Sequence, residues 1–412
     1  MSYYIGQQVV YFPEDGQLSE EFCNDNNLVR KKDDAGNNIG GYLDPGKRNI
    51  TTIRLRGEVS DGLILPIECL SKYTDISKLN DGDIIDTLNG HEICKKYIPE
   101  RNNRRGNQTT GNKTRKRSDP IAPLFKEHAD TEQLAYNLGT FSEGDEVEIT
   151  LKLHGTSARL GRLPVLKGYK RTLKDKLLHK KGNPIYDWGY IAGTRRTILD
   201  DFEGGFYGND HFREQSAKFF EGKLWKGETV YMEIVGFIDS GRPIMPSASN
   251  KKVNDKTFTK QYGDTTTFSY GCSPRKDSAM QNDFYVYRMT MTNEDGEVVE
   301  YPPDFMRYRC EQMGCKSVPV MWRGIINKPD STTYSEDFDA GEYIKDVAEQ
   351  FYDGPDPIGK THIREGVVVR ITNKPKFCAY KHKNQYFKIL SGIAKNDASE
   401  PDMEEAQDEL DG

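Results

Sequence analysis

The 412-residue sequence contains no run near the roughly 20 consecutive apolar residues that a membrane-spanning helix needs. Its first residues, MSYYIGQQVVYFPEDG, have neither a basic segment nor an apolar core, which argues against a secretory signal. The seven cysteines are scattered and include no CxxC pair, which argues against a disulfide scaffold, a zinc ribbon and a thioredoxin-type site. These absences predict a cytoplasmic protein with reduced thiols that does not span a membrane.

Charge is unevenly distributed along the chain. The net charge of −6 at first disfavours a nucleic-acid partner, but residues 396–412 alone hold eight carboxylates and no Lys or Arg. Without that segment, residues 1–395 carry a net charge of +2. Residues 101–118 and 167–181 each contain seven Lys or Arg, against no acidic residue and one Asp respectively. Both segments are candidates for contacts with nucleic-acid phosphates, and solvated loops are the alternative.

Short apolar runs and turns divide the sequence into four parts. Residues 1–100 contain strand-like runs such as TTIRLRGEVS, GLILPIE and GDIIDTL between Asp-Gly turns, which favours a small β-barrel. Residues 101–120 have no aliphatic or aromatic side chain and are expected to form a basic linker. Residues 121–395 alternate strand-like runs with polar connections, and 341–352 have the pattern of an amphipathic helix. The acidic tail, 396–412, is expected to be disordered.

Four motifs in the C-terminal two thirds combine charged residues with strand patterns. They are KLHGT at 152–156, YMEIVG at 231–236, REGVVVR at 364–370 and KHKNQYFK at 381–388. Taken singly, each is better explained by an ordinary strand with a surface lysine, an edge glutamate or a solvated basic face. Together they offer a lysine amine near other cations, which favour its neutral, nucleophilic form, and a carboxylate suited to Mg²⁺.

In this order the four motifs resemble those of the covalent nucleotidyltransferases, the superfamily of ATP-dependent ligases and mRNA capping enzymes. KLHGT, with His154 where DNA ligases usually have Asp, is similar to the motif of RNA ligases. EGVVVR and KHKNQYF resemble the branch that seals nicks in duplex RNA, and the resemblance covers about residues 145–393. Near the N-terminus, RLRGEVSDGLILPIECL resembles the front module of the Deinococcus-type RNA ligases, in which an OB domain precedes the nucleotidyltransferase domain.

The resemblance implies an α+β fold. An OB-like β-barrel that binds nucleic acid would occupy residues 1–100, and a nucleotidyltransferase domain of antiparallel sheets flanked by helices would occupy 121–395. The implied activity is ATP-dependent joining of RNA 3′-OH and 5′-phosphate ends through lysyl-AMP and RNA-adenylate intermediates, in RNA nick repair. The implied cofactors are ATP and Mg²⁺ or Mn²⁺. The implied partner is RNA, as nicked duplex, broken ends or ends splinted by DNA, and a monomer is the default oligomeric state.

The resemblance also assigns the charged residues of the motifs to parts of the nucleotide. The nucleophile is Lys152, His154 acts in the adenylylation step, Glu233 contacts the ribose hydroxyls, Glu365 binds metal, Lys381 and Lys383 contact the AMP phosphate, and Gly155 and Lys388 complete the nucleotide-binding set.

Two positions between the motifs leave a choice open. AGTRR at 192–196 resembles a Ser-Arg element that contacts phosphate, and Arg195 is preferred to Arg196, with a surface arginine as the alternative. DFYVYRM lies where the family stacks adenine on an aromatic ring. Tyr287 is preferred there, Tyr285 on the same strand face is second, and a core aromatic is the alternative.

The sequence departs from the family pattern in two ways. Ser157 stands where the duplex-RNA branch commonly has an Asn linked to the sealing step, so that step lacks its usual side chain. Only 19 residues follow Ile393, which is too few for the C-terminal OB domain usual in DNA ligases and capping enzymes. A GTP-dependent capping-type guanylyltransferase and a non-catalytic nucleic-acid-binding protein on a ligase scaffold remain as alternatives.

Overall fold

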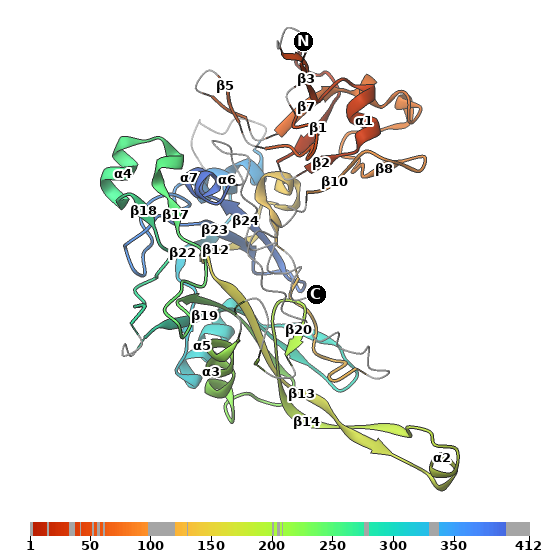
Figure 1. Cartoon of the computed structure of the whole chain (residues 1–412), viewed down its shortest axis with the longest axis vertical. Helices are drawn as coiled ribbons and strands as arrows, with labels where there is room; N and C mark the ends of the chain where they lie inside the picture. Colours follow the sequence, from red (N-terminus) through yellow and green to blue (C-terminus); the bar gives the residue numbers. More distant parts are fainter. Residues whose placement is uncertain are drawn as a thin grey trace. The chain divides into compact units, whose positions relative to one another are not determined.

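The computed structural model describes residues 3–97, 120–328 and 338–392, apart from short gaps at 15, 33–37, 42, 52, 56–57, 61, 130, 200–201, 204–206, 208 and 276–279. The expected basic linker, except residue 120, and the expected acidic tail lie outside the described residues. The chain divides into two units, one built mainly from residues 1–101 and the other mainly from 102–388 (Figure 1).

The first unit consists of short antiparallel strand pairs around an apolar core. Its helix α1 (Glu20–Asp25) begins at Ser19, whose hydroxyl accepts the Phe22 N–H, and it inserts Phe22 and Cys23 into that core. The strand pairs are β1 (Val9–Pro13) with β7 (Gly62–Pro66), β2 (Gly16–Leu18) with β10 (Cys94–Lys96), β3 (Arg30–Lys32) with β4 (Asn38–Gly40), β5 (Ile53–Leu55) with β6 (Glu58–Ser60), and β8 (Thr87–Leu88) with β9 (His91–Glu92).

The predicted strands in TTIRLRGEVS and GLILPIE are confirmed as β5, β6 and β7. The unit also contains two 3₁₀ helices, η1 (Ile67–Leu70) and η2 (Ile76–Lys78). Among the described residues the strand pairs do not close into a barrel, so the OB-like β-barrel is not confirmed and stays a prediction.

Two largely antiparallel sheets form the centre of the second unit, as the sequence predicted. The first has the order β11 (Glu132–Gln133), β24 (Cys378–Lys383), β23 (Gly366–Ile371), β12 (Glu146–Lys152), β22 (Val320–Ile325). The second has the order β15 (Ile198–Leu199), β14 (Asn183–Gly193), β13 (Thr156–Lys170), β16 (Glu228–Gly236), β19 (Asn282–Thr292), β20 (Val298–Glu300), with β21 (Lys316–Ser317) parallel to β19. The three residues between β12 and β13 connect the two sheets.

The five-stranded sheet has one apolar face because its side chains alternate. Its core cluster contains Val147 and Ile149 of β12 together with Ile344 of α6 (Ala340–Glu349). The helix begins at Asp339, whose carboxylate accepts two backbone N–H groups, and it confirms the helix expected at 341–352. The side chains at the alternate positions of β12, which include Lys152, point to the opposite face of the sheet.

Helices α3 (His211–Phe220) and α5 (Pro303–Met313) lie beside the seven-stranded sheet (Figure 1). A buried ion pair between Arg309 of α5 and Glu228 of β16, 2.7 Å long, fixes α5 to that sheet. No helix in the described ranges is long and apolar enough to cross a membrane. The remaining elements are η3 (Leu134–Tyr136), η4 (Leu138–Thr140), α2 (Leu173–Leu177), β17 (Ala248–Ser249), η5 (Asn250–Val253), α4 (Lys256–Tyr262), β18 (Thr265–Thr266) and α7 (Gln385–Leu390).

Candidate active site

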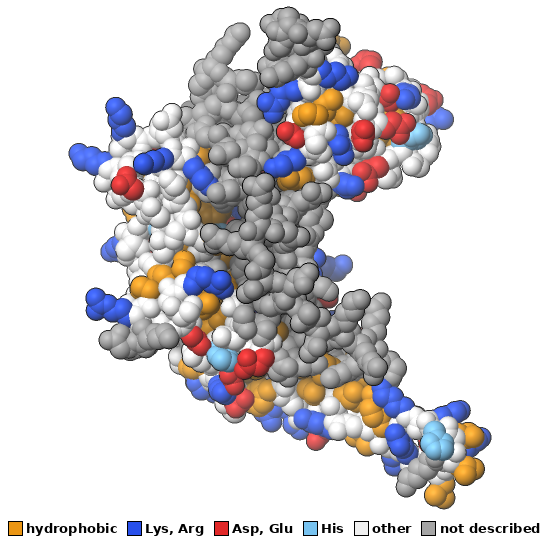
Figure 2. Space-filling view, in the orientation of Figure 1, with side chains coloured by type: hydrophobic (Ala, Val, Ile, Leu, Met, Phe, Trp, Pro, Cys, Tyr) orange, Lys and Arg blue, Asp and Glu red, His pale blue; other side chains and the backbone are white. Residues whose placement is uncertain are grey.

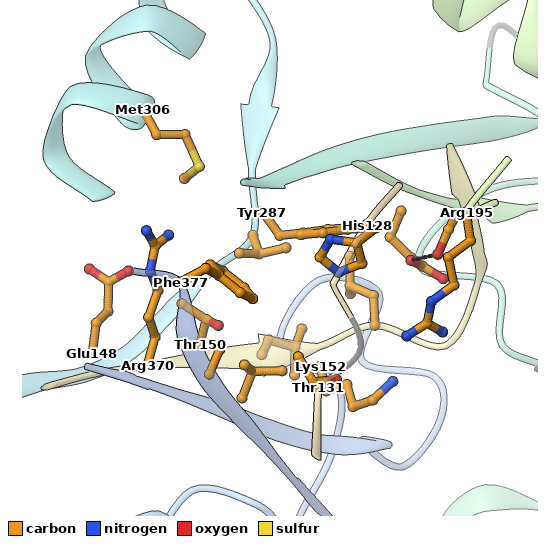
Figure 3. Close-up of a pocket in the computed structure, with 17 residues that line it drawn as sticks. His128, Thr131, Glu148, Thr150, Lys152, Arg195, Tyr287, Met306, Arg370 and Phe377 are labelled. Carbon is orange, nitrogen blue, oxygen red and sulfur yellow. Dashed lines mark hydrogen bonds between the residues drawn. The ribbon is translucent and has the colours of Figure 1, made fainter. Parts of the chain in front are cut away.

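A pocket of about 810 Å³, including the space at its open mouth, is lined by residues from both sheets of the second unit (Figure 3). The lining residues with polar or aromatic side chains are His128, Thr131, Glu148, Thr150, Lys152, Ser157, Arg195, Glu233, Tyr287, Arg370 and Phe377.

Strand register brings two lysines and a glutamate together beside the pocket. Lys152 is paired with Gly366, and Gly366 is paired in turn with Lys383, so the three strands place Glu365 between the lysines. The Lys152 Nζ lies 2.8 Å from Glu365 Oε1, and the Lys383 Nζ lies 3.4 Å from the same oxygen. Glu365 is completely buried, so its carboxylate stabilises both ammonium groups, while each ammonium favours loss of the proton from the other.

His154 is held tightly in the connection that follows Lys152. Its ring packs edge-on against Phe268 and Phe387, at centroid distances of 4.6 and 4.7 Å, and its Nδ1 lies 3.6 Å from Glu365 Oε2. Its backbone N–H donates to the Tyr270 hydroxyl at 2.7 Å. Burial raises the pKa of Tyr270 well above its usual value, so the hydroxyl stays neutral. These contacts fix the chain direction immediately after Lys152.

Gly155 lies where the connection crosses β16 closely. A Cβ at this position would lie 2.3 Å from the Ile234 carbonyl oxygen and 2.9 Å from Val235 Cγ1. We therefore expect Gly155→Ala to lower the free energy of unfolding by about 1–3 kcal/mol, because a backbone atom cannot move aside cheaply. Urea denaturation measures this. Gly168→Ala is the matched control, since no atom lies within 4 Å of a Cβ there, and equal stability of the two variants would contradict the argument.

Two neighbouring strands, β13 and β16, carry polar side chains that line the pocket with Lys152. Ser157 of β13 pairs with Glu233 of β16, and the Ser157 hydroxyl donates to Glu233 Oε2 at 3.4 Å, the dashed line in Figure 3. Glu233 is itself buried, and its carboxylate lies at the pocket surface.

A β-bulge separates the side chains of Tyr285 and Tyr287. Along β16 the partner shifts from Arg288 to Val286 between consecutive residues, which leaves Tyr287 as the extra residue on β19. A bulge redirects the side chains beside it, so the two tyrosines do not share one regular face. Tyr287 lines the pocket and Tyr285 lies in the core cluster. Burial, followed by the nearby Glu233 carboxylate, raises the pKa of Tyr287 above its usual value.

The two arginines that follow β14 lie in different environments. Arg195 lines the pocket, whereas Arg196 is exposed. The buried Arg159 side chain holds this segment in place, because its Nε donates to the Thr194 carbonyl and its Nη2 to the Arg196 carbonyl, each at 2.8 Å.

The remaining predicted residues lie outside the pocket lining. Lys381 of β24 pairs with Val368 of β23 and is half-buried. It lies two residues along the strand from Ala379, which lines the pocket. Lys388 is buried on α7. The structure thus brings Lys152, Lys383, Glu365 and His154 into contact. It gathers Ser157, Glu233, Tyr287 and Arg195 around one pocket, whose lining does not include Lys381 or Lys388.

Sequence reasoning missed an aromatic group beside Tyr287 in the pocket lining. The His128 ring lies 5.1 Å from Tyr287 and 5.9 Å from Phe377, between centroids, and its Nδ1 is 3.2 Å from Arg288 Nη1. Arg288 is held by Glu300, with 3.0 Å from Nε to Oε1, and its guanidinium lies 4.6 Å from the Phe377 ring. His128 lies in an irregular segment with no strand or helix periodicity, so no local signal indicated it.

A comparison with protein-family models matches the RNA ligase family over residues 145–390. The chain belongs to the RNA ligase family. The matched range contains Lys152, Glu233, Glu365 and Lys383, and it excludes His128 and residues 1–101. A comparison with curated protein sequences finds no match.

Solved structures of Naegleria gruberi RNA ligase are similar to this RNA ligase in fold. One mutant with ATP and Mn aligns with a TM-score of 0.52 at 15% identity, covering 93% of this chain and 87% of that chain. A second mutant with ATP and Mn has a TM-score of 0.51 at 15% identity, with 93% and 86% covered. The structure with PPi has a TM-score of 0.50 at 14% identity, with 94% and 87% covered. These similarities confirm the ligase-like α+β fold.

Proposed function

We propose that this RNA ligase uses ATP to join RNA 3′-OH and 5′-phosphate ends, through AMP bound covalently to Lys152 and then RNA-adenylate. The observation that carries the proposal is the amine of Lys152 at the wall of the pocket, 2.8 Å from a fully buried carboxylate and beside a second lysine. The family membership supports RNA joining, and the similar Naegleria gruberi structures contain ATP or PPi in the same fold. Nicked duplex RNA is the proposed substrate because the EGVVVR and KHKNQYF motifs resemble that branch.

In the first step, the Lys152 amine attacks the α-phosphorus of ATP. An N–P bond forms, the bond from the α-phosphorus to pyrophosphate breaks, and the amine gives up its proton. As long as Glu365 is paired with Lys152, it stabilises the unreactive ammonium form. Lys383 acts in the opposite direction, because its positive charge beside the same site favours the neutral amine and also attracts the phosphate.

A divalent cation is the proposed second cofactor, and the site fits one bound mainly by substrate. In the described part of the chain, no cluster of three or more His, Cys, Asp or Glu forms a dedicated metal site. Mg²⁺ in phosphoryl-transfer enzymes typically uses one or two carboxylates and takes its other ligands from phosphates and water. Glu365 is the proposed carboxylate, and the cation would neutralise phosphate oxygens during transfer.

The opposite wall is proposed to bind the nucleoside. Glu233, Arg195 and Tyr287 line the pocket, and in this proposal Glu233 accepts hydrogen bonds from ribose hydroxyls, Arg195 contacts phosphate and the Tyr287 ring stacks on adenine. Replacing Tyr287 by Leu is expected to raise the KM for ATP by roughly 5–100-fold, because stacking on a base contributes about 1–3 kcal/mol. Initial rates of AMP labelling at varied ATP concentration measure this effect.

Tyr285→Leu is the matched control for Tyr287→Leu. Tyr285 lies in the apolar core cluster, so its loss should lower the unfolding free energy and leave the KM for ATP near the wild-type value. The reverse result, a raised KM for ATP in the Tyr285 variant alone, would show that Tyr285 and not Tyr287 stacks on adenine.

The first unit is proposed to be an OB-like nucleic-acid-binding module of the kind found in Deinococcus-type RNA ligases. Its short strands, separate apolar core and exposed Tyr11 on β1 suit such a module, since OB surfaces bind strands through basic grooves and exposed aromatics. An experimental structure in which these strands close into a barrel would support the assignment, and an open arrangement would refute it.

Incubation with α-³²P-ATP or α-³²P-GTP and Mg²⁺, followed by denaturing electrophoresis, tests the proposed function. Protein first treated with pyrophosphate, to remove any AMP already attached, should become labelled with ATP and not with GTP. Labelling by GTP would favour the capping-type guanylyltransferase. Absence of label from either nucleotide would overturn the proposal.

A further inference from the structure

Strands β13 and β14 extend beyond the rest of their sheet as a two-stranded arm that ends at α2 (Figure 1). β13 pairs with β16 only from Thr156 to Gly161, whereas its pairing with β14 continues to Lys170. At about 3.3 Å per residue, the paired part beyond Gly161 is about 30 Å long. The base of the arm lies at the pocket, because the pocket-lining Ser157 is near the start of β13 and the pocket-lining Arg195 follows the end of β14.

Among the residues that the structure describes, packing against the rest of the second unit is concentrated at the base of this arm. Leu163 and Ile191 are buried with Phe125, and the Leu166 N–H donates to the Ile121 carbonyl at 2.7 Å. From residue 167 to residue 185, every described side chain is exposed or half-buried. A two-stranded ribbon is only marginally stable in water. Because residues 167–185, here called the outer arm, bury no described side chain, packing does not explain their sequence.

The outer arm is strongly basic and carries apolar side chains at its tip (Figure 2). Residues 167–181 contain seven Lys or Arg and a single acidic residue, Asp175. That carboxylate accepts from the hydroxyl and backbone N–H of Thr172, at 2.6 and 2.9 Å, so it is used in the local turn. Near the tip, Leu173 and Leu177 are 85% and 80% exposed.

We propose that this arm binds the backbone of the RNA duplex that flanks the ends being joined. The proposal rests on the proposed function and extends it to how the substrate is held. A dense group of exposed cations suits the evenly spaced phosphates of a polyanion, and duplex RNA is recognised mainly through its shape, phosphates and 2′-hydroxyls. Duplex RNA is A-form, and at a rise of roughly 2.8 Å per base pair an arm of about 30 Å spans about eleven base pairs beyond Gly161.

The reach of the arm gives a length-dependent test. The variant Lys167→Gln/Lys170→Gln/Lys174→Gln/Lys180→Gln removes four exposed cations. With a nicked duplex of about 24 base pairs on each side, its Kd is expected to rise about 10–100-fold at low salt, and the slope of log Kd against log salt to fall by about 3. With about 5 base pairs on each side, the arm is out of reach, and the variant should bind as the wild type does. Fluorescence anisotropy measures both.

The quadruple Lys→Arg variant at these four positions is the matched control, because it keeps every charge and should bind the long duplex like the wild type. Labelling with α-³²P-ATP should be unchanged in both variants, since the four side chains lie outside the pocket lining. Unlabelled wild-type protein would show that the proposed function has failed. Normal labelling with equal long-duplex affinity in the wild type and the Gln variant would overturn the arm proposal alone.

The exposed leucines provide an alternative occupant, another protein chain. In the variant Leu173→Ser/Leu177→Ser, sedimentation should show the same mass as the wild type if the arm binds RNA. A change in oligomeric state in this variant, together with unchanged RNA affinity in the Gln variant, would assign the arm to protein contacts and overturn the proposal.

Discussion

Lys152→Ala is expected to abolish the covalent AMP adduct, with labelling reduced by at least about 1,000-fold, because removing a nucleophile eliminates the bond-forming step. Label per mole of protein after incubation with α-³²P-ATP and Mg²⁺ measures the effect. Lys345→Ala is the matched control, since Lys345 is a partly exposed residue of α6 that pairs with Glu342 at 3.0 Å, outside the pocket lining. It should label like the wild type.

Lys152→Arg separates loss of the nucleophile from loss of structure. A guanidinium can keep an ion pair with the buried Glu365 carboxylate, so this variant should unfold near the wild-type urea concentration. It should nevertheless form no adduct, because an arginine side chain does not lose its proton under these conditions. Substantial labelling of either Lys152 variant would show that the nucleophile lies elsewhere.

Glu365→Gln should have the second large effect, on both stability and chemistry. The substitution leaves the ammonium groups of Lys152 and Lys383 near each other in a buried site without the carboxylate that lies 2.8 and 3.4 Å from them. Removing one partner of a buried ion pair typically costs about 3–5 kcal/mol of unfolding free energy. Labelling should also fall by at least about 100-fold, because the proposed metal-binding carboxylate is lost. Urea denaturation and α-³²P-ATP labelling measure the two effects.

The double variant Glu365→Gln/Lys383→Gln distinguishes the two roles of the carboxylate. Removing one of the two opposed ammonium groups should recover at least about 1 kcal/mol of the lost stability, the usual size of coupling between contacting residues. Labelling should not recover, since the carboxylate is still absent and the positive charge of Lys383 has also been removed. A single Glu365→Gln variant with wild-type stability and labelling would contradict both the ion-pair network and the metal assignment.

The parts of the site that lie on regular strands could be predicted from the sequence. Lys152 ends a strand of alternating apolar residues, and Lys383 and Glu365 flank two further strands, so each motif was visible within a few residues. The side-chain period of two on these strands then fixes which residues share a face. The predicted helix at 341–352 had a similarly clear local pattern and is confirmed by α6.

The parts that depend on irregular backbone could not be predicted. Tyr285 and Tyr287 have the spacing of one strand face, and only the bulge opposite Tyr231 separates them. His128 and Phe377 meet at the pocket from segments about 250 residues apart, without a pattern in either. In the first unit, the sequence predicted short strands and their closure into a barrel, and the barrel is not confirmed, because strand pairing depends on contacts distant in sequence.

Mass-spectrometric peptide mapping of the ATP-treated protein tests the central claim most directly. The account predicts a single AMP group, attached to the side-chain nitrogen of Lys152 and removed by pyrophosphate. AMP on Lys381, Lys383 or any other residue, or RNA joining by protein that never carries AMP, would contradict it.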